Sequence, residues 1–460
     1  MRMRSYIALL AMILLLGILA EARTRQTNIT AEMPLTTKSP EARSLYKQAM
    51  TDFANLHVDK AMQEWRKATK LDPNFAMAHI QLALNSHEPS EQQAEIQKAT
   101  KVVRKVSPGE RLFIRWIEGV REKNFVYGIQ AMNDVAAMFP KDKDVLYTAG
   151  NWLVVRESYE QSKKFMDKVL ALDPSYPPAL NDLGYDYAYM RDYKNAIATM
   201  ERYVAALPGE PNPNDSYAEI LRMSGDFNGA LEHYRAALKI DPTFTYSQLG
   251  IADTYALMGK EEQARAEYSK AVAAVHSDSD RIEFSIQAAM TWVRESKYSA
   301  ADAAFISIAS EAHAKGLYLH EAQAYRMMAQ YQPENALAIK ELVHAENVLS
   351  NNSSIPKADR DEEQARIWRW RAVRSANGGD RDSAEKCLTQ LASLSETSGS
   401  QVVERLYHAA MGGVLLAEGK ASDAIAHLEE DQGDAFTLKM LAEAYVKTGA
   451  LDQAQDTLKT

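Results

Sequence analysis

The chain has 460 residues, of which 46% are hydrophobic and 25% are charged, and its formal net charge is −9. This composition is typical of a folded globular protein and excludes a chain that is disordered throughout. The acidic balance disfavours general binding to nucleic acid or to anionic lipid, because both need a basic surface. The single cysteine, Cys387, excludes an internal disulfide and a thiolate metal cluster, and we expect its thiol to be buried or half-buried.

The N-terminus has the layout of a secretory signal peptide. Arg2 and Arg4 form a basic start, Tyr6–Ala20 is an apolar run, and Ala20-Glu21-Ala22 offers a cleavage site. We therefore expect residues 1–22 to be a signal peptide and residues 23–40 a flexible spacer, in an exported protein that is periplasmic or secreted. After cleavage no stable membrane insertion is expected. The alternative is an uncleaved signal anchor, for which the apolar run is short.

A period of 34 residues follows the spacer. It is marked by four prolines at equal intervals, Pro140, Pro174, Pro208 and Pro242. Within one period, apolar residues recur at helical spacing, then a turn follows, and then a second apolar stripe. A fixed period of this length predicts a stack of helix–turn–helix units, each ended by a proline that cannot continue the helix.

Small residues recur in pairs twelve positions apart, and each pair predicts a close approach of the two helices of a hairpin. A larger side chain there would overpack the contact, at a cost of about 1–3 kcal/mol. The pairs are Ala49 and Ala61, Gly150 and Ser162, Gly184 and Ala196, Ala218 and Ala230, Ala252 and Ala264, Ala289 and Ala301, Ala324 and Ala336, Ala372 and Ala384, Gly412 and Ala424, and Ala442 and Ala454.

The segment LNDLGYDYAYMRDYKNAIATMERYVAALP resembles a tetratricopeptide repeat, and the resemblance extends over about residues 42–460. It implies an all-α fold, a right-handed superhelical solenoid of antiparallel helix pairs with 23 or 24 helices from about residue 41. The predicted domains are an N-terminal array at 41–348, a linker or irregular segment at 349–364, and C-terminal repeats at 365–460 whose last repeat is incomplete. The stretch 76–108 departs from the regular period.

The resemblance also implies that the first helix of each hairpin lines a concave groove that binds a protein or peptide. Tyrosine offers a large contact area with few rotors, and asparagine bonds to both N–H and C=O groups of an extended backbone. The predicted groove residues are Tyr147, Asn151, Asn181, Tyr185, Tyr189, Asp215, Glu219, Arg222, Asp253, Arg294 and Tyr325. A subset of the family grips a terminal carboxylate, but only Asn151 matches that pattern, and Asp182 would repel the ligand.

No catalytic motif, metal-ligand pattern or cofactor fingerprint stands out, so we expect a non-enzymatic scaffold without cofactors. One alternative is a sensory or scaffolding component of a bacterial signalling system. Another is a helical-hairpin enzyme that processes glycans, which would need paired acids in a deep pocket; Asp215 and Glu219 are the best local pair. A basic stripe, Lys98, Lys101, Arg104 and Lys105, is interpreted as a solvated helix face rather than a polyanion site. The oligomeric state stays open.

Overall fold

The structure is a computed structural model that describes residues 32–86, 89–121, 125–155, 157–398, 400–431 and 433–459. Across these ranges it contains 24 α-helices, one short 3-10 helix and no strand, so the predicted all-α fold of paired helices is confirmed. The predicted signal peptide and most of the spacer lie outside the described residues. The chain forms two compact units, which divide between Ile240 and Asp241.

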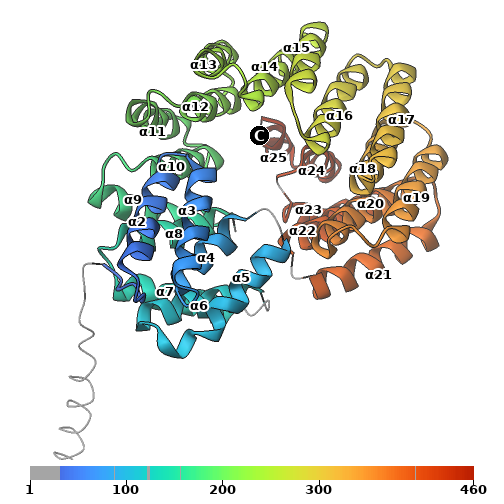
Figure 1. The fold of residues 1–460 in the computed structure, drawn as a ribbon. Helices are drawn as coiled ribbons and strands as arrows, with labels where there is room; N and C mark the ends of the chain where they lie inside the picture. The colour runs from blue at the N-terminus through green and yellow to red at the C-terminus, as the bar shows by residue number, and fades with distance from the viewer. Residues whose placement is uncertain are drawn as a thin grey trace, which may run out of the picture. The chain divides into compact units, whose positions relative to one another are not determined.

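The first unit consists of consecutive antiparallel helix pairs, coloured from blue to green in Figure 1. Its helices are α2 (Pro40–Ala54), α3 (Val58–Leu71), α4 (Ala76–Asn85), α5 (Pro89–Lys101), η1 (Val103–Lys105), α6 (Pro108–Arg121), α7 (Phe125–Met138), α8 (Lys143–Val155), α9 (Tyr159–Leu172), α10 (Pro177–Tyr189), α11 (Tyr193–Ala206), α12 (Pro211–Met223) and α13 (Phe227–Ile240).

The second unit continues the same alternation of helix and short turn (Figure 1). Its helices are α14 (Thr245–Leu257), α15 (Glu261–Ala274), α16 (Asp278–Arg294), α17 (Tyr298–Ala314), α18 (Tyr318–Tyr331), α19 (Asn335–Asn351), α20 (Lys357–Asn377), α21 (Arg381–Ser398), α22 (Gln401–Ala417), α23 (Ala421–Leu428), α24 (Ala435–Thr448) and α25 (Leu451–Lys459). The second helices of the last two pairs are short, with 8 residues in α23 and 9 in α25.

The small residues lie where paired helices approach most closely. A Cβ added to Gly184 would stand 2.5 Å from Met200 on the partner helix, and one added to Gly412 would stand 2.5 Å from Leu428. Ala196 and Ala424, the partners of these glycines in the sequence pattern, are both fully buried. The spacing of small residues therefore encodes the distance between the helices of a hairpin.

One of the ten predicted pairs is wrong. Ala324 is fully buried as expected, but Ala336 is exposed, and Ala338 is buried in its place. The reason is the length of α18, which continues for seven residues beyond Ala324, whereas α14 continues for five beyond Ala252. The longer helix moves the small position of α19 two residues along the chain.

The helix ends lie where the periodic prolines and the turn glycine predicted them. Helices α7, α9, α11 and α13 each end two residues before one of the four periodic prolines. Gly225 adopts a left-handed conformation with φ of 87°, as predicted for the turn after α12. Glu157, Arg191 and Ser296 take positive φ values at other turns, so the turn geometry persists where glycine is absent.

The end of the predicted spacer is docked onto the first unit rather than flexible. Met33 is buried, and the buried Glu110 carboxylate accepts hydrogen bonds from the Thr36 backbone N–H at 2.9 Å and from its hydroxyl at 2.5 Å. Thr37 donates to Asp72 at 2.6 Å. We call residues 32–39 the strap. The prediction of a flexible segment was wrong for these residues, because their polar side chains and backbone find partners far along the chain, on α6 and on the loop after α3.

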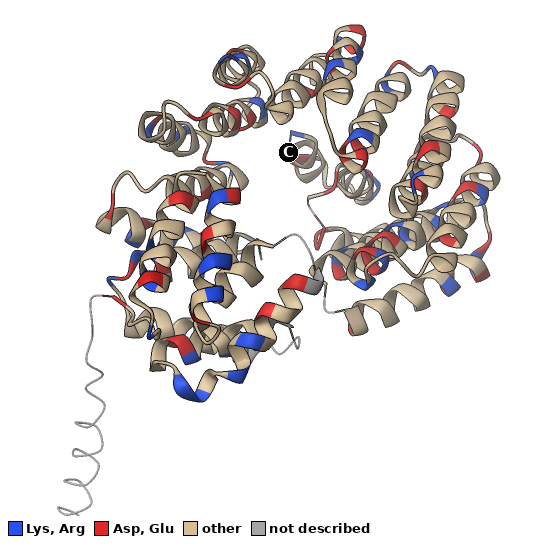
Figure 2. Cartoon of the chain, viewed as in Figure 1, with Lys and Arg blue, Asp and Glu red and all other residues tan. Residues whose placement is uncertain are grey.

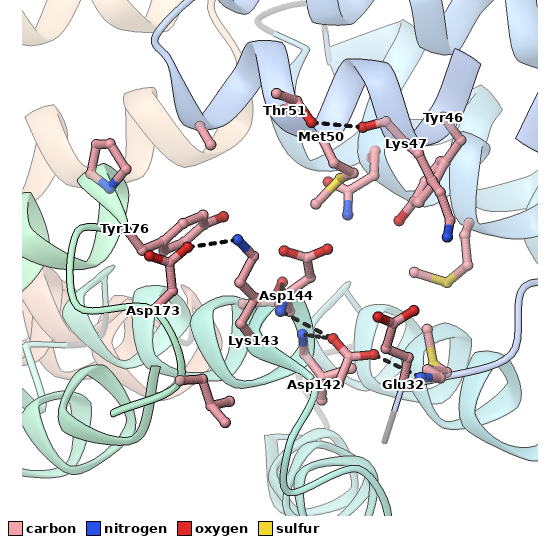
Figure 3. A pocket seen from close by; sticks show the side chains of 18 of the residues that line it. Glu32, Tyr46, Lys47, Met50, Thr51, Asp142, Lys143, Asp144, Asp173 and Tyr176 are labelled. Carbon is pink, nitrogen blue, oxygen red and sulfur yellow. Dashed lines mark hydrogen bonds and ion pairs between the residues drawn. The ribbon is translucent and has the colours of Figure 1, made fainter. Parts of the chain in front are cut away.

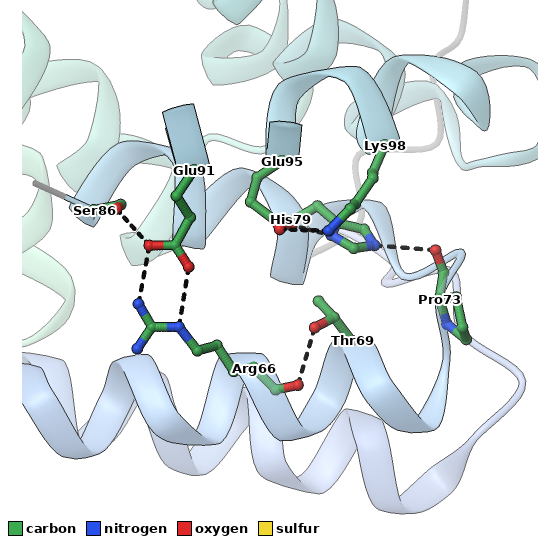
Figure 4. Close-up of polar contacts among 8 residues, drawn as sticks. All are labelled: Arg66, Thr69, Pro73, His79, Ser86, Glu91, Glu95 and Lys98. Atoms are coloured by element: carbon green, nitrogen blue, oxygen red, sulfur yellow. Dashed lines mark hydrogen bonds and ion pairs between the residues drawn. The ribbon is translucent and has the colours of Figure 1, made fainter. Parts of the chain in front are cut away.

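The irregular stretch 76–108 forms the hairpin α4–α5, and a set of polar contacts ties it to α3 (Figure 4). Arg66 makes two hydrogen bonds to Glu91, at 2.9 and 3.0 Å. His79, which is buried, lies 2.5 Å from Glu95 through Nδ1 and 3.0 Å from the Pro73 carbonyl through Nε2. These side-chain contacts hold the α4–α5 hairpin against α3 and the loop after it, in a stretch whose sequence departs from the regular period.

The predicted break at 349–364 is much narrower than expected. Helix α19 extends to Asn351 and α20 begins at Lys357, which leaves only 352–356 outside a helix. Pro356 precedes the first turn of α20 and Asp359 lies within it, a combination that favours a helix start over a linker. The division between compact units falls instead at 240–241.

Candidate functional site

Three first helices of the first unit, α8, α10 and α12, carry the predicted groove residues in matching stripes. Asn181, Tyr185 and Tyr189 follow one another at four-residue steps on α10, so they share one face of that helix. The residues 34 positions earlier or later occupy α8 and α12, and α10 contacts both of these helices. The repeat period therefore places equivalent polar side chains beside one another.

The α8 and α10 stripes are joined through a buried carboxylate. Asn151 donates from Nδ2 to Asp182 at 2.9 Å, and Asp182 is 8% exposed. Burial raises the pKa of Asp182 to about 6, although hydrogen bonds from Asn151, Asn181 and Tyr147 oppose the rise. Asn151 is thus held by its own chain, which supports the rejection of a carboxylate clamp at this position.

The α10 and α12 stripes are joined through Tyr185. Its hydroxyl donates to Glu219 at 2.7 Å, and Arg222 lies 3.4 Å from the same carboxylate. Burial and the Glu219 charge raise the pKa of the Tyr185 hydroxyl well above its ordinary value. Glu219 is therefore engaged with neighbouring side chains, whereas Asp215 is half-buried on the preceding turn of α12.

An exposed aromatic cluster ends the α10 stripe. Tyr189 is 49% exposed, stacks on Tyr159 with ring centres 4.7 Å apart, and lies 6.1 Å from the ring of Tyr185. Stacked rings with an open face offer apolar contact area together with hydroxyl groups. This tyrosine cluster is the most accessible part of the predicted groove in the first unit.

The remaining predicted groove residues belong to the second unit. Asp253 accepts a hydrogen bond from Tyr268 at 2.5 Å, Arg294 lies 4.0 Å from Glu261, and Tyr325 stacks on His344 with ring centres 3.9 Å apart. Each of these contacts ties neighbouring helices together. These three residues belong to the second unit, whereas the stripes on α8, α10 and α12 belong to the first.

The first unit also contains a pocket of about 700 Å³, which the sequence did not reveal (Figure 3). Its walls come from the strap, the first helices α2, α4, α6 and α8, and the loop that leads into α10. The lining residues on which the argument depends are Tyr46, Met77, Phe113, Asp142, Asp144 and Tyr176.

The charged groups of the pocket differ in whether they have partners. Asp142 accepts hydrogen bonds from the backbone N–H groups of Met33, Asp144 and Val145, at 2.7, 3.0 and 3.2 Å. Asp173 is paired with Lys143 at 2.9 Å. No hydrogen bond or ion pair joins the half-buried Asp144 carboxylate to another residue of the described ranges, and Figure 3 shows it in the middle of the pocket.

Electrostatics single out the same carboxylate. Burial and the neighbouring Asp142 charge raise the pKa of Asp144 to about 6. Tyr176 lines the pocket with 3% of its surface exposed, and its buried hydroxyl has no hydrogen-bond partner. Sequence reasoning missed both residues, because neither belongs to the stripe positions of a first helix. The cluster Lys141-Asp142-Lys143-Asp144 at the start of α8 was the available signal.

The basic stripe and the single cysteine do not form a binding or catalytic site in the described structure. Lys98, Lys101, Arg104 and Lys105 are exposed, but α5 ends at Lys101, so they do not form one continuous helix face. Figure 2 shows basic and acidic residues interspersed along the helices of each unit. Cys387 is 2% exposed, as predicted.

Two further features, a metal-binding cluster and a membrane-spanning helix, are absent from the described residues. No three His, Cys, Asp or Glu side chains stand close enough together there to hold a metal ion. Likewise, no helix within those ranges combines the length and the apolar character that crossing a bilayer requires.

The repeat assignment is tested by comparison with family models. Residues 221–283 match the model described as Tetratricopeptide repeat. The chain therefore carries a tetratricopeptide-repeat segment at residues 221–283. Tetratricopeptide repeats serve in general as protein–protein interaction scaffolds, and their usual role is not catalytic. No curated protein matches the chain.

Several solved structures resemble parts of the chain at low identity. MamA from Desulfovibrio magneticus RS-1 is 18% identical, with a TM-score of 0.32, covering 36% of this chain and 94% of its own. The Cut9–Hcn1 hetero-tetramer of the APC/C is 16% identical with a TM-score of 0.41, and the match covers 88% of this chain and 76% of that one. A tetratricopeptide repeat protein from Parabacteroides merdae is 13% identical with a TM-score of 0.37, and the match covers 59% of this chain and 94% of that one. Because none of these TM-scores exceeds 0.41, the likenesses say nothing further about this chain.

Proposed function

We propose that the chain is a non-enzymatic scaffold that binds a polypeptide partner along the first helices of its first unit. The observation that carries the proposal is the tyrosine cluster at the end of the α10 stripe. Tyr189 presents about half of its surface to solvent although it stacks on Tyr159. Tyrosine is enriched among the residues that dominate protein interfaces, because it buries a large area at a low cost in side-chain entropy.

The neighbouring groups support an extended peptide as the ligand. Asn181 lies two turns before Tyr189 on the same face of α10, and its side-chain carbonyl oxygen is buried without a hydrogen-bond partner in the described chain. If a peptide draws this side chain outward, its amide suits the N–H and C=O groups of an extended backbone. The repeat period supplies further polar side chains on α8 and α12, so a peptide that crosses the helices would meet related groups in each repeat.

A crosslinking experiment tests this proposal. A photoreactive phenylalanine analogue is placed at position 189, and at Tyr298 as the control, since Tyr298 is also exposed and aromatic but lies on the second helix α17. In extracts of the native cell envelope, we expect a defined polypeptide to be crosslinked from position 189 and not from position 298. Equal crosslinking from both positions would contradict the proposal.

The affinity for the crosslinked partner, produced separately, then measures the contribution of the cluster. The substitution Tyr189→Ala is expected to weaken binding at least about fivefold, since interface tyrosines commonly contribute more than about 1 kcal/mol each. Tyr298→Ala should leave the affinity unchanged. This pair is a sharper test than Asn151→Ala, because Asn151 is already hydrogen-bonded to Asp182 and its loss would disturb the fold.

One observation favours the enzymatic alternative. Asp144 lies in a pocket with its pKa raised to about 6, as a general acid requires. Paired-acid hydrolysis needs a second carboxylate that is free to act, whereas Asp142 and Asp173 are engaged by backbone N–H groups and by Lys143. Asp215 and Glu219 do not line the pocket of about 700 Å³, and Glu219 is already bonded to Tyr185. We therefore retain the scaffold.

The cellular location is a proposal that rests on the sequence. The basic start, apolar run and small-residue cleavage site at residues 1–22 support an exported protein, periplasmic or secreted. N-terminal sequencing of the protein recovered from its native host is expected to begin at Arg23. A chain that retains Met1 and stays in the membrane fraction would favour the signal-anchor alternative. The signalling role stays a further alternative, to be judged by the identity of the crosslinked partner.

A further inference from the structure

The pocket of the first unit has the size of a site for a small ligand. Its volume of about 700 Å³ falls within the range of about 300–1,000 Å³ that is typical of small-ligand sites. Four first helices and the strap form its walls, so residues from the beginning of the chain and from α8 face one another across it (Figure 3). A polar pocket of this size is more than the packing of helical hairpins requires.

Two polar groups in this pocket lack partners. The Tyr176 hydroxyl is buried, and it has no hydrogen bond within the described chain. A buried polar group without a partner costs about 1–3 kcal/mol, so such a group is normally matched by something. Figure 3 shows the hydroxyl on the side of the ring that faces the pocket, and the Asp144 carboxylate is directed into the same space.

The acidic groups that face a ligand are Asp144 and, from the strap, Glu32, and Asp144 is the one without a hydrogen-bond partner in the described chain. Asp142 is engaged by three backbone N–H groups, and Lys143 is neutralised by Asp173. Lys47 and Lys141 are exposed at the rim. A ligand group that reaches the interior therefore meets a carboxylate and a phenol oxygen, both of which accept hydrogen bonds.

The pocket walls suit an aliphatic stem. Tyr46, Met77 and Phe113 line the pocket and are each at most 6% exposed. Lysine and arginine side chains pack their methylene groups on such surfaces while the charged end keeps polar partners. The combination of an apolar wall with a carboxylate at its end matches a cation on a short hydrocarbon chain.

We propose that this pocket binds an alkyl ammonium or guanidinium group, which donates hydrogen bonds to the Asp144 carboxylate and to the Tyr176 hydroxyl oxygen. The group comes from a lysine or arginine side chain of a polypeptide or from a free diamine, since both present the same chemistry. The peptide source rests on the scaffold function proposed above, whereas the free diamine does not.

Titration calorimetry on the full chain tests the assignment with defined probes. These are short alanine–glycine peptides with one central lysine, the same peptides with norleucine or glutamate in its place, and cadaverine. We expect the lysine peptide to bind at least about tenfold more tightly than the norleucine peptide, because a charge-assisted hydrogen bond is lost with the ammonium group. If cadaverine binds and no peptide does, the pocket assignment holds and the polypeptide source fails.

Matched variants locate the binding. Asp144→Asn is expected to weaken binding of the lysine peptide at least about tenfold, and Tyr176→Phe about threefold. Asp134→Asn removes the same charge from an exposed position on α7 and should leave the affinity unchanged. The comparison of lysine with norleucine uses the unaltered protein, so it remains decisive even if a variant does not fold.

Three results would overturn the proposal. One is an unaltered chain that binds neither the lysine peptide nor cadaverine. A second is tighter binding of the glutamate peptide, which would make the rim lysines the recognising groups. The third is full affinity of Asp144→Asn for the lysine peptide, which would place the cation elsewhere.

Discussion

Two acidic residues of the first unit, Asp182 and Asp144, share a raised pKa but differ in their surroundings. Burial raises the pKa of each to about 6. Asp182 accepts a hydrogen bond from Asn151 between two first helices, whereas Asp144 faces a pocket without a hydrogen bond from the described chain. The difference teaches that a shifted pKa alone does not distinguish a structural carboxylate from a binding one; the presence of internal partners does.

The largest effect is expected from removing the structural carboxylate. Asp182→Ala leaves Asn151 without its acceptor in a buried setting, so we expect the free energy of unfolding to fall by about 2–3 kcal/mol. Urea denaturation measures the change. A loss below about 0.5 kcal/mol, which is usual for surface positions, would break the comparison by showing that Asp182 is not structural.

The pH dependence of stability should report how far Asp144 is removed from solvent. Its pKa is raised in the folded state from 3.8 to about 6, so the folded chain holds the proton more tightly than the unfolded chain does. The stabilisation is complete below pH 3.8 and is lost as the pH rises to about 6. Relative to the unaltered chain, Asp144→Asn should therefore gain about 2 kcal/mol over that interval, after allowance for partial exposure.

Urea denaturation at several pH values between 4 and 7 measures this gain. The control is Asp134→Asn, an exposed position, whose curve should run parallel to that of the unaltered chain. Parallel curves for Asp144→Asn as well would mean that Asp144 is solvated like a surface carboxylate, and the comparison with Asp182 would then lose its basis.

The smallest change in stability is expected from two tyrosines, one with a hydrogen-bond partner and one without. Tyr185 donates to Glu219, whereas the buried Tyr176 hydroxyl has no partner. Tyr185→Phe is expected to destabilise the chain by about 1 kcal/mol, and Tyr176→Phe to stabilise it by about 1 kcal/mol. Thermal unfolding of the two variants, each differing from the unaltered chain by one oxygen atom, reports the sign. Destabilisation by Tyr176→Phe would reveal a partner for its hydroxyl.

Much of the architecture could be predicted from local signals. The interval of the prolines located the ends of α7, α9, α11 and α13, and the small residues located the contacts within hairpins. The failure at Ala336 has a local cause, because α18 extends two residues further past its small residue Ala324 than α14 does past Ala252, which shifts the register of α19. The break expected at 349–364 was overestimated because polar residues that favour a helix start were interpreted as a loop.

The candidate site was predictable only in part. The stripe positions on α8, α10 and α12 follow from the repeat period, and the structure places Asn181, Tyr185 and Tyr189 on one face of α10 as expected. Which of these side chains are occupied by neighbours could not be predicted, because the partners come from adjacent repeats and depend on side-chain rotamers. Asn151 and Glu219 proved to be engaged, whereas Tyr189 remained open.

By itself the sequence determined the helical hairpins and their order, since periodicity, small residues and prolines act over a few turns of one chain segment. Only the tertiary structure decided where the strap docks and that a pocket exists. Glu110 binds Thr36 across 74 positions of sequence, and the pocket joins Tyr46 to Tyr176. Such contacts depend on how successive hairpins pack against one another, and a small rotation between repeats accumulates over the stack in a way that no local pattern encodes.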